Sequence, residues 1–209
     1  YSSDKSKILT KFLTLRQQLK KKDGEPNIAL SDFIAPKESK IEDYIGCFCV
    51  STGFGSDELA KEYEDKIDDY SSIMVKALAD RLAEAYAEYL HRLVRTKKWG
   101  YNQNEKLDNN ELIKESYQGI RPAPGYPACP DHLEKTSIWE LLNVEKAIGV
   151  KLTESLAMWP ASSVSGYYFA SNKSKYFGLG NINQDQLVDY AERRNISVEK
   201  AQKWLSPNL

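Results

Sequence analysis

The sequence has few of the residues from which disulfide scaffolds and zinc sites are built, with two histidines and three cysteines among its 209 residues. An odd and small number of cysteines excludes a disulfide-stabilised scaffold and makes a Cys/His zinc cluster a poor explanation. Excess charge of one sign is also lacking, because 29 Lys and Arg face 30 Asp and Glu. Non-specific affinity for nucleic acid depends on surplus Lys and Arg, so we expect no nucleic-acid partner.

Long apolar runs are lacking too, and none approaches the roughly 18 residues that cross a bilayer. No signal-peptide pattern opens the chain. We therefore expect a cytoplasmic protein with no membrane partner. The chain begins with Tyr1 rather than Met, which indicates processing or a cut from a longer protein. An apolar fraction of 41% and a charged fraction of 28% are typical of a soluble globular protein.

Apolar spacing predicts a mixture of helices and strands. We expect helices over residues 1–25, 57–96 (broken near 68–69), 108–118, 137–148, 183–194 and 197–205. Strands are expected over residues 43–52, buried on both faces, and over residues 163–170 and 175–179 as a hairpin-like pair. Regular alternation of strands and helices is missing, so the pattern favours an α+β fold over a doubly wound sheet.

The long helical segment has two distinct faces. Ile73, Leu78, Leu82 and Tyr89 recur at helical spacing and predict a stripe that packs in the core. The acidic face contains Asp80, Glu84, Glu88 and His91. A charged helix face usually meets only water, so ordinary solvation is the first explanation for it and a functional surface the second.

Residues 121–132 (RPAPGYPACPDH) stand apart, because they hold four of the eight prolines. Each proline fixes its own φ and pushes the preceding residue toward an extended conformation, so the segment is stiff. Ala123 and Gly125 would let a ligand approach the main chain, Arg121 offers a fork for a carboxylate, and Tyr126 an aromatic face. A surface loop or a polyproline packing segment is the simpler explanation, and a preorganised ligand-binding loop the functional one.

The same segment, with the following EKTSIWELL, closely resembles the S-adenosylmethionine-binding loop of the activation domain of cobalamin-dependent methionine synthase. Similar stretches cover residues 29–46, 68–91, 104–132, 152–169 and 174–197 and the ending WLSPNL. The resemblance implies a single activation domain over residues 1–209, with a twisted antiparallel sheet flanked by helices. The family's N-terminal section, with its aromatic-Pro-Phe-Phe stretch and an acidic residue for the ligand's ammonium, has no match in residues 1–28. We therefore expect the C-terminal portion of the domain.

The resemblance also implies a function. The family domain binds S-adenosylmethionine and presents its methyl group when the cofactor has been oxidised to cob(II)alamin, while a flavodoxin or a flavoprotein reductase supplies an electron. Cobalamin belongs to a separate domain of the parent methyltransferase, which would be a partner of this chain, and zinc belongs only to the parent's other domains. No catalytic residue and no metal ligand are then expected in this chain, because positioning of the methyl donor is its main task.

By resemblance, nine residues form the expected binding site. Arg121 matches the arginine that pairs with the ligand carboxylate, and Ala123 matches a position whose backbone contacts the ligand. Gly125 and Tyr126 lie in the same loop, and Tyr126 matches a tyrosine near the methyl donor. Tyr176 and Phe177 match an aromatic pair that closes the site. Asp80, Glu84 and Glu115 match acidic residues on the face toward the ligand and cobalamin.

Two other functions are considered. A stand-alone S-adenosylmethionine-dependent methyltransferase is disfavoured because the chain lacks a strand, Gly-rich loop and helix at its start. A module that offers the proline-rich segment as a peptide ligand is disfavoured because Arg121, Tyr126, Tyr176 and Phe177 together suit a pocket better. The three cysteines have no zinc or redox spacing and are expected to be buried structural residues.

Overall fold

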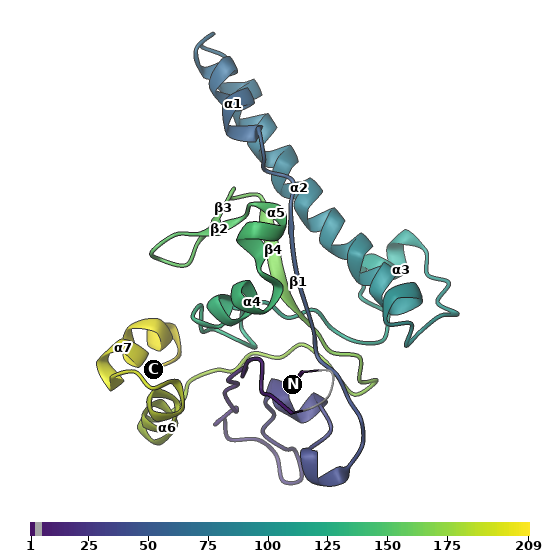
Figure 1. Cartoon of the computed structure of the whole chain (residues 1–209), viewed down its shortest axis with the longest axis vertical. Helices are drawn as coiled ribbons and strands as arrows, with labels where there is room; N and C mark the ends of the chain where they lie inside the picture. The colour runs from purple at the N-terminus through teal and green to yellow at the C-terminus, as the bar shows by residue number, and fades with distance from the viewer. Residues whose placement is uncertain (3–5) are drawn as a thin grey trace. The chain divides into compact units, whose positions relative to one another are not determined.

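A computed structural model describes residues 1–2 and 6–209 of the chain (Figure 1). Its contacts divide the chain into two compact units, each built from separate stretches of sequence. Unit 1 consists of residues 1–46, 118–141 and 166–209, and unit 2 consists of residues 47–117 and 142–165. The proline-rich loop, residues 121–132, belongs to unit 1, and the long helix belongs to unit 2. The prediction of a single domain over residues 1–209 stays a prediction.

Two short sheets contain the strands of the described chain. Strand β1 (Gly46–Ser51) pairs with β4 (Ser163–Tyr168), and β2 (Lys151–Leu152) pairs antiparallel with β3 (Met158–Trp159). The predicted strand over residues 43–52 is thereby confirmed in a shorter form. Only one face of β1 is buried, by Phe48 and Val50, and the other is half-buried. The expectation of two buried faces was therefore wrong.

Unit 2 is dominated by α1 (Ser56–Glu64) and α2 (Asp69–Leu93), which confirm the long helical segment and its break. The side chain of Asp68 caps α2 by accepting a hydrogen bond from the Ser71 N–H at 3.0 Å. A π-helical turn over Val94–Lys98 follows α2. Further along the chain lie α3 (Asn109–Ile113) and α5 (Val144–Ile148).

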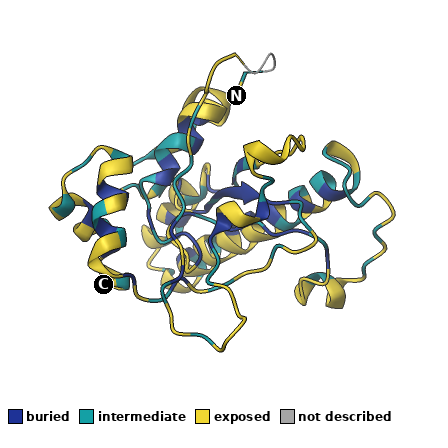
Figure 2. Cartoon of the chain, turned by 90° about the horizontal axis from the view of Figure 1, so that it is seen from below, coloured by how far each residue is buried: buried dark blue, intermediate teal, exposed yellow. Residues whose placement is uncertain are grey.

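The apolar stripe predicted as the core face of α2 is instead exposed. Ile73, Leu82 and Tyr89 are 67%, 59% and 56% exposed, whereas the buried positions on α2 are Ser72, Ala79, Ala83, Ala87 and His91. Figure 2 shows that helices of this chain have exposed positions beside buried ones. The small alanine side chains let the main chain come close to the helix, as the Thr52 hydroxyl shows by donating to the Ala79 carbonyl at 2.7 Å. Close approach to a small-residue face therefore decided which side of α2 is buried.

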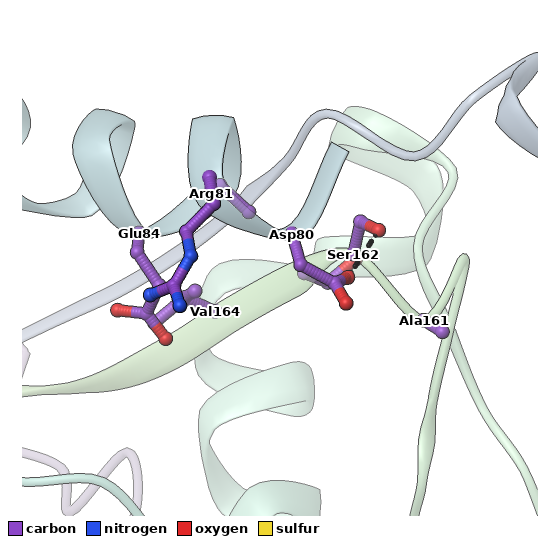
Figure 3. A pocket seen from close by; sticks show the side chains of 8 residues that line it. Asp80, Arg81, Glu84, Ala161, Ser162 and Val164 are labelled. Carbon is purple, nitrogen blue, oxygen red and sulfur yellow. Dashed lines mark hydrogen bonds between the residues drawn. The ribbon is translucent and has the colours of Figure 1, made fainter. Parts of the chain in front are cut away.

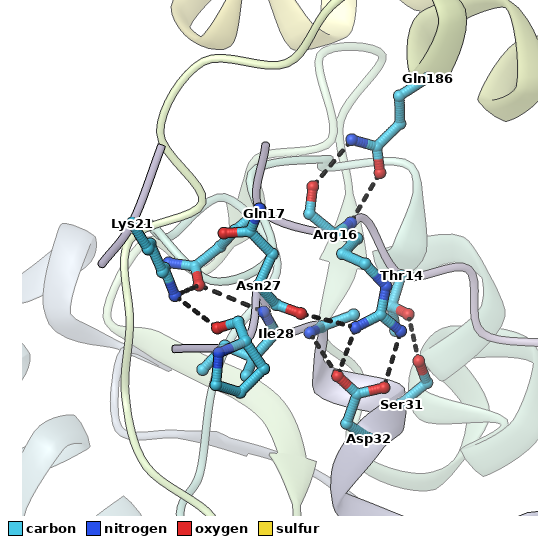
Figure 4. A network of polar contacts seen from close by, with 11 residues as sticks. Thr14, Arg16, Gln17, Lys21, Asn27, Ile28, Ser31, Asp32 and Gln186 are labelled. Atoms are coloured by element: carbon cyan, nitrogen blue, oxygen red, sulfur yellow. Dashed lines mark hydrogen bonds and ion pairs between the residues drawn. The ribbon is translucent and has the colours of Figure 1, made fainter. Parts of the chain in front are cut away.

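Unit 1 contains no helix among the described residues of segment 1–25, so the predicted first helix was wrong; its positions 3–5 lie outside the described residues. The backbone N–H groups of this segment bond to distant partners. The Leu13 N–H donates to Glu134 Oε1 at 3.0 Å and the Arg16 N–H to Gln186 Oε1 at 2.6 Å. Arg16 also forms a two-pronged ion pair with Asp32 (Figure 4). These tertiary bonds replace the bonds that a helix would have made internally.

The main apolar cluster of unit 1 joins Leu15 to the C-terminal helices α6 (Gln184–Arg194) and α7 (Val198–Leu205). Ser197 caps α7 by accepting from the Lys200 N–H at 3.2 Å. Both helices agree with the sequence-based prediction within two residues. Segment 26–41 contains two short 3₁₀ turns, Leu30–Phe33 and Lys37–Ser39.

Three further predictions needed correction. The helix expected over residues 137–148 is two helices, α4 (Glu134–Leu142) and α5, because Asn143 adopts a left-handed conformation between them. The helix expected over residues 108–118 is the short α3. Residues 175–179 form no strand, because they bond to the proline-rich loop instead. The Tyr176 hydroxyl accepts from the Arg121 N–H, and the Leu179 N–H donates to the Pro127 carbonyl. The prediction of an α+β fold with antiparallel strands is confirmed; the antiparallel pairing observed is confined to small sheets.

Candidate functional site

The proline-rich loop is fixed within unit 1 at its start and middle. Ile120, just before the loop, forms an antiparallel bridge with Phe169. The Tyr167 N–H donates to the Pro122 carbonyl at 2.9 Å, and the Leu179 N–H donates to the Pro127 carbonyl at 2.8 Å. A loop that is stiff in itself and bonded at several points presents its side chains in one arrangement, which lowers the entropy cost of binding a ligand.

The structure brings Arg121 and Tyr176 together, although they lie 55 positions apart in the sequence. The Arg121 N–H donates to the Tyr176 hydroxyl at 3.0 Å. Phe177, the next residue, packs edge-on against Phe33 with ring centroids 6.4 Å apart. Tyr176 is 41% exposed and Tyr126, in the loop, 61% exposed. The structure therefore places the main chain of Arg121 against the Tyr176 side chain within unit 1.

Gly125 occupies a position that only glycine fills without strain. Its φ is +93°, and a Cβ added there would lie 2.3 Å from Cε1 of His132. The His132 ring is held between this loop and α7, where it packs against Trp204 with centroids 6.2 Å apart. Burial and the nearby Lys135 ammonium lower the pKa of His132, so the ring is neutral near pH 7. His132 thus shapes the inner side of the loop, and the outer side stays open.

Substitution Gly125→Ala should destabilise the protein more than Gly24→Ala. Both glycines have φ near +90°, but nothing lies within 4 Å of a Cβ at Gly24. The control therefore carries only the backbone strain of about 1 kcal/mol, and Gly125→Ala should cost about 1 kcal/mol more because His132 must move. Urea unfolding of both variants checks this. Equal costs would show that the contact with His132 does not constrain the loop.

Unit 2 holds a hollow of about 380 Å³ beside α2. Two of the predicted acidic residues, Asp80 and Glu84, line it, together with Arg81, Ala83 and residues 161–164 (Figure 3). The Ser162 hydroxyl donates to Asp80 Oδ1 at 2.5 Å. That bond orients one carboxylate, and Glu84 extends from the next turn of the same helix. We call this cavity the α2 hollow; its carboxylates suit a cationic or hydrogen-bond-donating group.

Glu115, the third predicted acidic residue, is exposed and is not among the residues lining the α2 hollow. It directly follows the last turn of α3 and its C-cap, and has a φ of +53°. A left-handed conformation at a glutamate is uncommon and costs of order 1 kcal/mol, so the surrounding structure must hold it. Its N–H donates to the Leu112 carbonyl at 3.0 Å.

A buried guanidinium supports the segment that carries Glu115. Arg95, in the π-helical turn, has a fully buried side chain that bonds to Glu105 through two hydrogen bonds of 2.6 and 2.8 Å. Its guanidinium carbon lies 3.8 Å from the centre of the Tyr117 ring. His91, also buried, is 3.2 Å from the Tyr101 hydroxyl. This cluster was missed by sequence reasoning, because Arg95 stands among lysines that look like a solvated helix end.

The three cysteines form no disulfide bond, and the surroundings of two of them keep the thiol protonated. Burial raises the pKa of Cys49 to about 12, and burial and the nearby Glu134 carboxylate raise the pKa of Cys129 well above the ordinary value. Across residues 1–2 and 6–209, no group of three potential ligands is placed to hold a metal ion. Within the same residues, no helix combines the length and the hydropathy needed to cross a membrane.

Comparison with known proteins identifies the family to which this chain belongs. Residues 1–195 match the family described as "Vitamin B12 dependent methionine synthase, activation domain". The match covers more than half of the chain, so the chain belongs to this family. The resemblance first seen in the proline-rich loop is thereby confirmed.

A solved structure gives a more detailed comparison. The chain is 60% identical, with a TM-score of 0.92, to the protein in a crystal structure of the MetH reactivation domain bound to AdoHcy. The alignment covers 94% of this chain and 60% of that one, so the chain spans about three-fifths of the solved relative. At this level of identity the fold is shared over nearly the whole chain.

Proposed function

We propose that this chain forms part of a reactivation domain that binds S-adenosylmethionine within a cobalamin-dependent methionine synthase. The observation that carries the proposal is the AdoHcy bound to a relative of 60% identity. AdoHcy is S-adenosylmethionine without the transferable methyl group, so one site accommodates both. In this proposal Arg121, which lies in the proline-rich loop, binds the carboxylate of the ligand.

The residues of unit 1 fit the amino-acid end of the ligand. Arg121 provides a planar fork of donors for a carboxylate. The main chain at Ala123 has only a methyl side chain beside it, so a ligand can approach it closely. At Gly125 the space beside the Cα is filled by His132, and the residue itself is exposed. Tyr126, Tyr176 and Phe177 offer aromatic faces, which attract a cationic sulfonium or ammonium.

The acidic residues of unit 2 suit the same positive charges. Asp80 and Glu84 line the α2 hollow, and Asp80 is oriented by Ser162. We propose that Asp80, Glu84 and Glu115 lie on the surface that meets ligand and cobalamin. When bound by its own domain, cobalamin supplies the cobalt that accepts the methyl group; this chain binds the donor, orients it and limits access of water.

We also propose the partners of this chain and the compartment in which it acts. The cobalamin-binding domain of the same enzyme would dock on this chain, and a flavodoxin or flavoprotein reductase would supply the electron. Homocysteine methyl transfer by the whole enzyme, in the cytoplasm, is then the activity that this domain restores. Zinc would be required only in other domains of the parent enzyme.

Calorimetric titration with S-adenosylmethionine tests the proposal. The chain should be compared with a longer version that has the full length of the solved relative, of which this chain spans 60%. We expect the longer version to bind, and the present chain to bind more weakly by about 1.5–3 kcal/mol for each charge-assisted bond that the remaining residues supply. Absence of binding to both would overturn the proposal. Methyl transfer to a small acceptor without cobalamin would support a stand-alone methyltransferase instead.

A further inference from the structure

We propose that Arg194, at the end of α6, is a positioning residue for the proline-rich loop: it ties both ends of the loop into one buried network. The inference rests on the proposed function, because the loop matters for carrying Arg121 to the ligand. Arg194 does not belong to the loop and carries no recognisable motif. Its role follows from two sets of contacts within unit 1 and from the balance of charge in the network that they form.

The first set fixes the end of the loop. Arg194 Nη2 bonds to Asp131 Oδ2 at 2.9 Å, and Asp131 is the second-last residue of the loop. The Tyr190 hydroxyl donates to the same carboxylate, and the Leu133 N–H donates to its other oxygen at 2.7 Å. Asp131 is 2% exposed, so its bonds are made in a site from which water is excluded.

The second set leads to the start of the loop. Arg194 Nη2 also bonds to Oε1 of Glu134, which is fully buried at the first position of α4. The Tyr167 hydroxyl donates to Glu134 Oε2 at 3.0 Å, while the Tyr167 N–H donates to the Pro122 carbonyl at 2.9 Å. Pro122 is adjacent to Arg121. A continuous path of bonds therefore runs from Arg194 through Glu134 and Tyr167 to the neighbour of the ligand-binding arginine.

The third observation is the balance of charge. The network holds two buried carboxylates and one guanidinium whose side chain is 14% exposed. The other titratable groups beside it are the hydroxyls of Tyr190 and Tyr167, the buried thiol of Cys129 and, next to the two carboxylates in the chain, the His132 ring and the buried Lys135, whose pKa values are both lowered by burial. Without Arg194 both buried carboxylates would lose the cation that is paired with them, which is strongly unfavourable. They would then either take up protons or draw the loop out of place.

Hydrogen exchange of the chain without ligand tests this role. In Arg194→Met, protection of the loop amides at Gly125 and Cys129, which bond within the loop, should fall about tenfold or more. Arg193→Met is the matched control: Arg193 is the preceding residue and pairs with the exposed Asp189, so loop protection should stay within about twofold. Arg194→Lys keeps the charge but not the fork and should show a smaller loss.

The pH dependence separates positioning by charge from simple packing. Protection factors correct for the intrinsic effect of pH on exchange. In Arg194→Met they should recover when the pH is lowered from about 8 to about 5.5, because the buried carboxylates then become protonated. Adding Asp131→Asn and Glu134→Gln to Arg194→Met should remove this pH dependence.

Three results would overturn the proposed role of Arg194. Loop protection in Arg194→Met and Arg194→Lys that equals the wild-type value would refute the proposal. So would a loss that is spread evenly over α6 and α7, or one that does not change with pH. Because no ligand is present, these outcomes are independent of whether the chain binds S-adenosylmethionine.

Discussion

Replacing Arg121 by alanine is expected to weaken binding of S-adenosylmethionine to the longer reactivation domain by about 2 kcal/mol or more. That corresponds to a rise of about thirtyfold in Kd. The loss is large because a buried ligand carboxylate would keep no partner of opposite charge. The main chain of Arg121 is held by the Tyr176 hydroxyl and by the neighbouring bond at Pro122, so the truncated loop should keep its course.

Two further variants make this result specific. Arg121→Lys keeps the charge but loses the planar fork, so its affinity should lie between those of the wild type and the alanine variant. Arg193→Ala removes an exposed arginine of the same unit and should leave the affinity unchanged. Calorimetry measures all of them. Unchanged affinity in Arg121→Ala would remove this residue from the binding site.

Replacing Arg95 by methionine is expected to lower the free energy of unfolding by about 3–5 kcal/mol. The substitution leaves the buried Glu105 carboxylate without its counter-ion, and loss of one partner from a buried pair has this cost. It also removes the cation from the Tyr117 ring, which is worth about 1–2 kcal/mol when water is excluded. The segment that carries Glu115 should be the first to lose its structure.

Urea unfolding measures the effect, and Arg92→Met provides the matched control on an exposed side chain three residues earlier. The control should change the unfolding free energy by no more than about 0.5 kcal/mol. Adding Glu105→Gln to Arg95→Met should recover part of the loss, because the fully buried carboxylate at position 105 is then replaced by a neutral amide. A cost below about 1 kcal/mol for Arg95→Met would show that the buried pair contributes little.

Features determined by local chemistry were predictable from the sequence. The prolines and glycine of segment 121–132 fix the backbone of the loop, and the caps at Asp68 and Ser197 mark the starts of α2 and α7. Segment 43–52, which contains strand β1, is rich in β-branched and aromatic residues and was recognisable for the same reason. In each case the deciding interactions lie within a few residues of one another.

Features decided by distant contacts were not predictable. Residues 8, 12, 15 and 19 have the spacing of a helix, yet Leu13 and Arg16 bond to Glu134 and Gln186, more than 100 positions away. The large apolar residues of α2 have the spacing of a core stripe, but the alanine face is buried because only small side chains allow the β1 segment to approach. The spacing of apolar residues therefore predicts that a helix has an apolar face, but not whether another segment packs against that face.

The candidate site shows the same division. Resemblance in the loop pointed to Arg121, and the contact of Arg121 with Tyr176 agrees with a site that includes the late aromatic pair. Ser162, which orients Asp80, and Arg194, which holds both ends of the loop, carry no pattern of their own. Such supporting residues become visible only when distant segments are placed side by side.

The coupling between Arg121 and the ligand carboxylate tests the central claim most directly. Calorimetry with S-adenosylmethionine and with its decarboxylated analogue, each against wild-type and Arg121→Ala forms of the longer domain, completes a thermodynamic cycle. We predict a coupling free energy of about 1.5–3 kcal/mol, because the alanine variant should lose affinity only for the ligand that has the carboxylate. Equal losses for both ligands, or none for either, would contradict the account.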